Sequence, residues 1–267
     1  MKPEIAAQRT SSKVRSWIPQ HEVNAEFVMS GYGAGGGIIG AFIDAGVNSG
    51  RQKNAEARVQ ELRKHVRDLD ARAVFQQELA KEVGKVEWIN TGSFETIADP
   101  VLPKVTKEMV GNGAVVTIGT SYRISQDCRV LVVSSGIDYY AKGKYRQPLA
   151  SVLVAYHSKE IGQPDGEGAI ALWAANDGAA FREVIREAVA EDVKLVRHAL
   201  DVMGAGEPKT KTRRLEAVLL HARGDFGIKM SRVSLKGTVV EESADRIIFR
   251  AKTGQFFSLP MAEVKLK

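Results

Sequence analysis

The chain of 267 residues has little of the chemistry that marks an enzyme. It contains one cysteine, Cys128, which excludes an internal disulfide and a cysteine-rich zinc site. None of its five histidines lies within five positions of another histidine or of the cysteine. It also lacks the G-x-S-x-G nucleophile elbow and the Lys-Ser/Thr ending of a phosphate-binding loop. We predict a protein that is not an enzyme, with no catalytic residues, metal ligands or cofactor.

The single thiol does not change this prediction. Cys128 follows Asp127 at the start of an expected strand. A neighbouring carboxylate raises the pKa of a thiol and so disfavours the reactive thiolate. We therefore expect Cys128 to be buried or inert.

The excess of positive charge is small and dispersed. The 38 Lys and Arg residues outnumber the 32 Asp and Glu residues, and acids are interspersed among the bases. The densest basic run, at residues 209–214, is predicted to be a solvated loop rather than a phosphate or lipid-headgroup site. Three scattered tryptophans do not form the stacking platform typical of RNA readers. We predict no nucleic-acid partner.

The first 20 residues show no recognisable leader. They include Glu4, Arg9 and Lys13, and they lack the unbroken apolar stretch of a secretory signal. Two locations therefore stay open. The protein is cytoplasmic, or it is periplasmic or associated with the outer membrane after a leader has been removed.

Apolar periodicity predicts two long helices. Residues 51–83 place an apolar stripe at steps of four and three, and residues 179–203 repeat that pattern after Asn176-Asp177-Gly178. Turn-bounded apolar runs predict strands at 86–89, 114–125, 129–140 and 150–158, the last three as an antiparallel meander. The extended stretch before Pro19 also favours a strand, and three short strands are expected near the carboxyl terminus.

We therefore expect an α+β fold with two long helices packed on an antiparallel or mixed sheet and a small β-rich, SH3-like extension. The predicted division of the chain has four parts: an extended segment at 1–30, a glycine-rich contact segment at 31–50, an α+β domain at 51–205, and a linker with the β-rich tail at 206–267.

The glycine-rich segment, GYGAGGGIIGAFIDAGVNSG, is the most informative stretch. If it is helical, small residues recur along one face of the helix. Asp44 is the only charged residue of the segment. Each interior glycine costs roughly 0.5–1 kcal/mol relative to alanine, and close approach of another backbone would offset that cost. The predicted contact residues are the small ones of this face: Gly33, Gly36, Gly37, Gly40, Ala41 and Ala45.

Three interpretations of this segment stay open. It is a tightly packed internal helix or loop, a contact between copies of the chain, or a helix that inserts in a membrane. Insertion places Asp44 at mid-depth, at a cost of roughly 2.5–3.5 kcal/mol. A fourth possibility, dinucleotide binding by the Gly31–Gly37 loop, matches the G-x-G-x-x-G spelling. It lacks the strong preceding strand and the following β–α–β unit that such binding requires.

The order of motifs resembles a known group of proteins. GGGIIGAFIDAGVNSGRQKNAE runs into a charged helix, followed by SYRISQDCRVLVV, YHS, WAANDG and a closing GTVVEE with DRIIFR and GQFFSLP. This order resembles that of uncharacterised envelope proteins and candidate lipoproteins of Gram-negative bacteria, a family without assigned catalytic residues. The arrangement is also similar to the domain of the curli-channel lipoprotein and to the N-terminal domain of the Tol-system β-propeller protein. The chain departs from that family in lacking a lipobox cysteine.

The resemblance and the glycine-rich segment together predict a non-catalytic component of the cell envelope. It would act by oligomeric assembly or membrane contact through the small-residue face. The expected partners are further copies, other envelope proteins or a membrane surface. The alternative is a soluble ligand- or nucleotide-binding protein that uses the Gly31–Gly37 loop.

Overall fold

The computed structural model describes most of the chain outside the glycine-rich segment. The described residues are 12–18, 24–25, 57, 59–89, 91–97, 104–125, 127–163, 167–205, 211–222 and 228–267. Their elements are β1 (Ser12–Trp17), β2 (Asn24–Ala25), α3 (Ala71–Val83), β3 (Thr91–Ile97), α4 (Lys107–Gly111), β4 (Ala114–Ile124), β5 (Leu131–Tyr140), β6 (Ala150–His157), α5 (Glu167–Ala205), β7 (Arg213–Ala222), β8 (Ile228–Glu242), β9 (Arg246–Ala251), β10 (Phe256–Pro260), the 3-10 helix η3 (Met261–Glu263) and β11 (Val264–Leu266).

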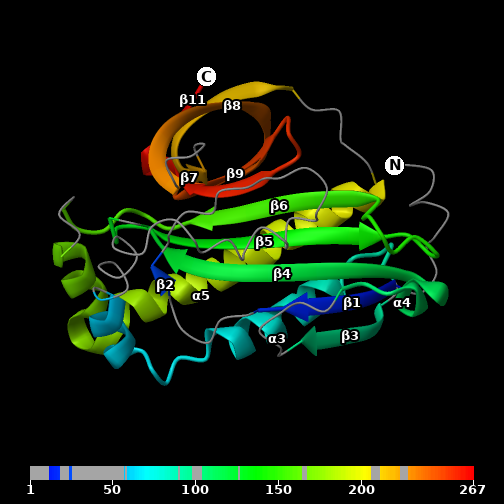
Figure 1. Ribbon diagram of the computed structural model, residues 1–267. Coiled ribbons are helices and arrows are strands. Elements are labelled where there is room, and N and C mark those ends of the chain that lie inside the picture. Colours follow the sequence, from blue (N-terminus) through cyan, green and yellow to red (C-terminus); the bar gives the residue numbers. More distant parts are fainter. Residues whose placement is uncertain are drawn as a thin grey trace.

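All described strands belong to one mixed sheet of eleven strands. Its order is β11-β7-β8-β9-β10-β6-β5-β4-β1-β3, with β2 beside β4. Strands β4, β5 and β6 form the predicted antiparallel meander, and β1 lies parallel to both β3 and β4. Strand β10 pairs in parallel with β6, so the carboxyl-terminal strands continue the central sheet and then curl over its end (Figure 1).

One face of the central sheet packs on α3 and α5. Alternate residues of β4 and β5, such as Ile118 and Ile137, are fully buried in a cluster that includes Leu79 of α3 and Val196 of α5. A second, smaller cluster fills the curl of the carboxyl-terminal strands around Phe249. The long helix α5 therefore lies between the sheet and solvent along much of its length (Figure 1).

Helix α5 contains a sharp corner near its start. Asn176, Asp177 and Gly178 all have positive φ, at 51°, 59° and 74°, so the helix is interrupted between residues 174 and 179. Asn, Asp and Gly are the residues that tolerate this left-handed backbone best. The segment after the corner matches the predicted helix at 179–203.

The predicted fold with two long helices and a small β-rich extension is wrong. α5 is the one long helix among the described residues, and residues 59–65 form a separate helical segment that ends before α3 begins. Asp70 caps the start of α3 by accepting a hydrogen bond from the Ala73 amide at 3.0 Å. The apolar stripe continues in helical register across this break, so periodicity alone could not detect it.

Two further predictions are corrected by the arrangement of the strands. Residues 86–89 form a loop with a turn at 87–88 rather than a strand. The carboxyl-terminal strands are not a small extension, because they supply about half of one continuous sheet. The four-part division of the chain stays a prediction. None of the described helices combines the length and apolar composition needed to cross a bilayer.

Candidate functional site

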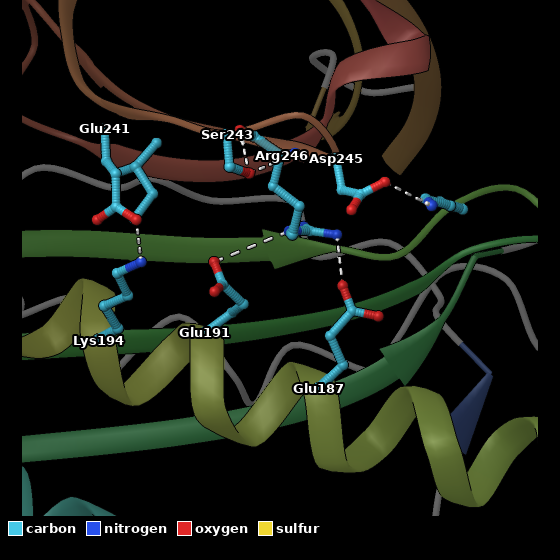
Figure 2. Close-up of a pocket in the computed structure, with 9 residues that line it drawn as sticks. Glu187, Glu191, Lys194, Glu241, Ser243, Asp245 and Arg246 are labelled. Atoms are coloured by element: carbon cyan, nitrogen blue, oxygen red, sulfur yellow. Dashed lines mark hydrogen bonds and ion pairs between the residues drawn. The ribbon is translucent and has the colours of Figure 1, made fainter.

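A cleft of about 340 Å³ lies between α5 and the turn that joins β8 to β9 (Figure 2). Glu187, Glu191 and Lys194 are three or four positions apart, which places them on one face of α5. They point toward the β8–β9 side in Figure 2. The residues that line the cleft are mostly charged: Lys159, Glu187, Glu191, Lys194, Glu241, Ser243, Asp245, Arg246 and Ile248.

Arg246, the first residue of β9, is the centre of this cleft. Its guanidinium donates from Nη1 to Glu187 at 2.9 Å and from Nη2 to the His157 carbonyl at 2.6 Å. It also donates to the side chain and the carbonyl of Ser258, at 3.0 and 2.9 Å. The guanidinium carbon lies 4.3 Å from the centre of the Tyr156 ring. Arg246 thus joins β6, β9, β10 and α5, and all three nitrogens of its planar guanidinium donate hydrogen bonds.

Ser258 extends the connection to a second acid on the helix. Its hydroxyl donates to Glu191 Oε2 at 2.6 Å, and the same carboxylate lies 3.8 Å from Arg246 Nε. Ser258 is fully buried, whereas the side chain of Glu191 retains 19% of its exposure. The contact therefore connects β10 to α5 beside Arg246.

The outer rim consists of more exposed ion pairs. Lys194 on α5 binds Glu241 on β8, and Lys159 lies 3.7 Å from Asp245 in the turn. His198 Nε2 lies 3.9 Å from Glu241, and burial lowers the pKa of this histidine more than the nearby acids raise it. Exposed ion pairs of this kind contribute little to stability, about 0–1 kcal/mol.

His157, whose carbonyl binds Arg246, has a buried and neutral side chain. It is 2% exposed, and burial, with the nearby cations Arg123 and Arg246, lowers its pKa to about 3. Burial likewise raises the pKa of the Tyr156 phenol, so that it remains protonated. The guanidinium of Arg246 lies over the Tyr156 ring and donates to the backbone carbonyl of His157.

The ion pairs that line the cleft hold α5 against the sheet. Each of its four acidic and three basic side chains lies within 4 Å of an opposite charge. Among these residues, loss of the buried Arg246 should reduce the stability of the fold most, because removing one partner of a buried pair leaves an uncompensated charge. No group of three or more His, Cys, Asp or Glu side chains in the described part of the chain could hold a metal ion.

A second polar group is buried between α5 and the sheet, away from the cleft. Asp192 of α5 accepts a hydrogen bond from the Ser135 hydroxyl of β5 at 2.5 Å. Ser135 lies 2.7 Å from the Thr120 hydroxyl of β4. Burial raises the pKa of Asp192 to about 7.

The residues predicted from sequence lie elsewhere. The small-residue face, Gly33, Gly36, Gly37, Gly40, Ala41 and Ala45, lies outside the described residues, as does the Gly31–Gly37 loop. Both contact and nucleotide binding by this segment stay predictions. Of the basic run at 209–214, the described side chains of Lys211, Arg213 and Arg214 are exposed, and the last two begin β7.

Cys128 is buried, as predicted. Its backbone has a φ of 58°, and its carbonyl accepts a hydrogen bond from the indole of Trp173 at 2.7 Å. The described histidines lie in separate surroundings: His65 contacts Asp177 at 3.3 Å, whereas His157 and His198 lie near the cleft.

Sequence reasoning missed the cleft residues. The spacing of Glu187, Glu191 and Lys194 was available as a signal for one polar helix face. Nothing local indicates that Arg246 meets Glu187, because 59 positions separate them. No protein-family model and no curated protein sequence matches this chain.

Proposed function

We propose that this protein is a non-catalytic component of the cell envelope that acts by assembling with further copies of itself. The sequence resemblance is what supports the envelope location, and the small-residue segment is what supports self-association. The observation in the described structure that best supports assembly is the edge strand β3.

Strand β3 ends the sheet with seven residues and pairs with β1 alone among the described strands. An edge strand presents backbone N–H and C=O groups that can pair with another chain. Natural edges are usually protected by lysine, proline, a bulge or short length. β3 contains no Lys or Pro, and its one charge, Glu95, is already paired with Lys13 and Arg15 on β1. Its pairing with β1 is irregular at one point, between Thr91 and Ser93, and is regular from Ser93 to Ile97.

The opposite edge of the sheet is protected. Strand β11 has three residues and carries Lys265, and Lys267 follows immediately after it. This difference between the edges favours β3 as the edge that accepts a second chain. The cleft supports a non-catalytic role as well, since its charged groups bind one another.

The mass of the particle in solution tests this proposal. Light scattering coupled to size exclusion, in buffer and in mild detergent, is expected to give a multiple of the 29.1 kDa chain mass. Ser93→Lys and Thr96→Lys place a charge at exposed positions of β3 and should shift the mass toward the monomer. Ser234→Lys, at an exposed position of the interior strand β8, is the matched control and should leave the mass unchanged.

The small-residue face is tested by the same measurement. Gly37→Leu and Ala41→Leu would prevent close backbone approach and should dissociate the assembly without unfolding the chain, as followed by circular dichroism. A wild-type protein that remains monomeric at every concentration, with and without detergent, contradicts the proposal.

A further inference from the structure

The buried chain of Thr120, Ser135 and Asp192 connects α5 to the two central strands. Ser135 donates to Asp192 Oδ2, so the Thr120 hydroxyl must donate to the Ser135 oxygen. The other carboxyl oxygen of Asp192, Oδ1, is buried without a hydrogen-bond partner. A carboxylate at this position would therefore carry charge on an oxygen that nothing stabilises.

The surroundings of Asp192 are apolar. The residues one turn before and after it on α5 are Ala188, Val189, Leu195 and Val196, which are at most 4% exposed. On the sheet, Tyr139 of β5 belongs to the same buried cluster as these helix residues, and burial raises the pKa of its phenol, so it stays neutral.

The charged groups on neighbouring elements have other partners. On α5, Glu191 accepts from Ser258 and Lys194 binds Glu241. On α3, Glu82 pairs with Lys85 and lies 3.4 Å from Arg197. Burial is the largest cause of the raised pKa of Asp192, opposed by the Ser135 hydrogen bond.

We propose that the Thr120–Ser135–Asp192 chain is a proton-dependent lock that fastens α5 to β4 and β5. The helix is held when Asp192 is protonated and loosened when the carboxylate ionises. The protonated acid keeps its hydrogen bond to Ser135 and places no charge in the core. The ionised acid retains that bond but adds a buried charge, which favours opening of the α5–sheet contact.

The direction of the pH effect follows from proton linkage. The pKa of Asp192 is about 7 in the folded protein, against an ordinary value of 3.8 for an aspartate. Between these values the folded state binds more protons than the unfolded state, so stability falls as pH rises. The stability that protonated Asp192 contributes is fully present below about pH 4. It is lost as the pH rises from about 4 to 7, and above pH 7 stability no longer changes through this group.

His157 has the opposite effect in an overlapping range. Its pKa of about 3 in the folded state makes stability rise with pH up to about 6.5. The two slopes largely cancel in the wild-type protein between pH 4 and 6.5. A test of the lock must therefore compare the wild type with a variant at Asp192 rather than follow the wild type alone.

Urea unfolding of the full chain at pH 5, 6, 7 and 8 provides that comparison. Asp192→Asn keeps the shape and an oxygen that can accept from Ser135, but it cannot ionise. The unfolding constant of the wild type, divided by that of D192N, should rise roughly a hundredfold from pH 5 to 8. Asp245→Asn, at a side chain that is 80% exposed, is the control and should give a constant ratio.

Two additional measurements keep the test decisive if D192N folds poorly. Ser135→Ala removes the one donor that lowers the pKa of Asp192, so stability should continue to fall above pH 7, where the wild type becomes constant. Hydrogen exchange at pH 6 and 8, corrected for intrinsic rates, should show increased opening in α5 and β5 peptides of the wild type. A pH-independent wild-type to D192N ratio, or S135A and exchange profiles that do not change as stated, overturns the proposal.

Discussion

Gly204 on α5 lies directly against the indole ring of Trp88. A Cβ added to Gly204 would be 2.0 Å from Cδ1 of Trp88. The same indole donates a hydrogen bond to the Leu200 carbonyl at 2.8 Å and packs edge-on against Tyr139 at 5.6 Å. The absence of a side chain at one position of α5 thus allows the loop after α3 to contact both the helix and the sheet.

Gly204→Ala is expected to destabilise the fold by roughly 1–3 kcal/mol, because the added methyl group displaces a buried indole. Helix propensity favours alanine by about 1 kcal/mol, so a net loss identifies the clash as the cause. Gly111→Ala in α4, where an added Cβ has no atom within 4 Å, is the control. Urea unfolding measures both variants, and an equal response of the two would contradict the assigned contact.

Arg246→Gln should destabilise the protein by about 3–5 kcal/mol. The variant leaves Glu187 without its cation and the buried carbonyls of His157 and Ser258 without donors. Lys159→Gln removes an exposed ion pair of the same cleft and should change stability by less than about 0.5 kcal/mol. Thermal and urea unfolding distinguish these outcomes. A small loss in Arg246→Gln would show that the guanidinium does not hold α5 to the sheet.

His157 should give the protein an acid-sensitive stability. Burial, with the cations Arg123 and Arg246, lowers its pKa to about 3. The unfolded state therefore binds an extra proton between about pH 6.5 and 3, so stability is lost as pH falls through this range. The unfolding constant of the wild type, divided by that of His157→Gln, should increase roughly tenfold for each unit by which the pH falls from 6 to 4. A constant ratio would contradict the lowered pKa.

Alanine substitutions at Gly178 and Gly143 allow the cost of backbone strain to be distinguished from the cost of a steric clash. Both have positive φ, at 74° and 76°, but an added Cβ would meet Val66 at 2.7 Å only at Gly178, with no atom within 4 Å at Gly143. Gly143→Ala should cost about 1–2 kcal/mol from strain, and Gly178→Ala should cost clearly more. Equal losses in unfolding experiments would show that the α5 corner tolerates the added methyl group.

The central meander was predictable because its information is local. Each of β4, β5 and β6 has its own apolar residues, and turns that include residues 127–128 and 142–143 separate them. The helix after Gly178 was predictable for the same reason, since its apolar spacing and its start signal lie within one stretch.

The helical break before α3 and the loop at 86–89 were not predictable from periodicity. The apolar stripe from Val59 to Val83 keeps its register across the break, and the local sequence of the loop is typical of a strand. What decides the loop is the contact of Trp88 with Leu200, which is 112 positions away. The same limit hid the cleft, where strands β9 and β10 bring Arg246 to a helix that precedes them by more than 40 residues.

The amino-acid sequence by itself determined where most strands and the main helix form, because side-chain periodicity and turn residues act over a few positions. It also predicted the burial of Cys128. Only the tertiary structure decided that all described strands join one sheet, that Arg246 closes the cleft and that Asp192 meets Ser135. These relationships depend on pairings between distant segments, whose partners are chosen by packing and by the need to satisfy buried polar groups.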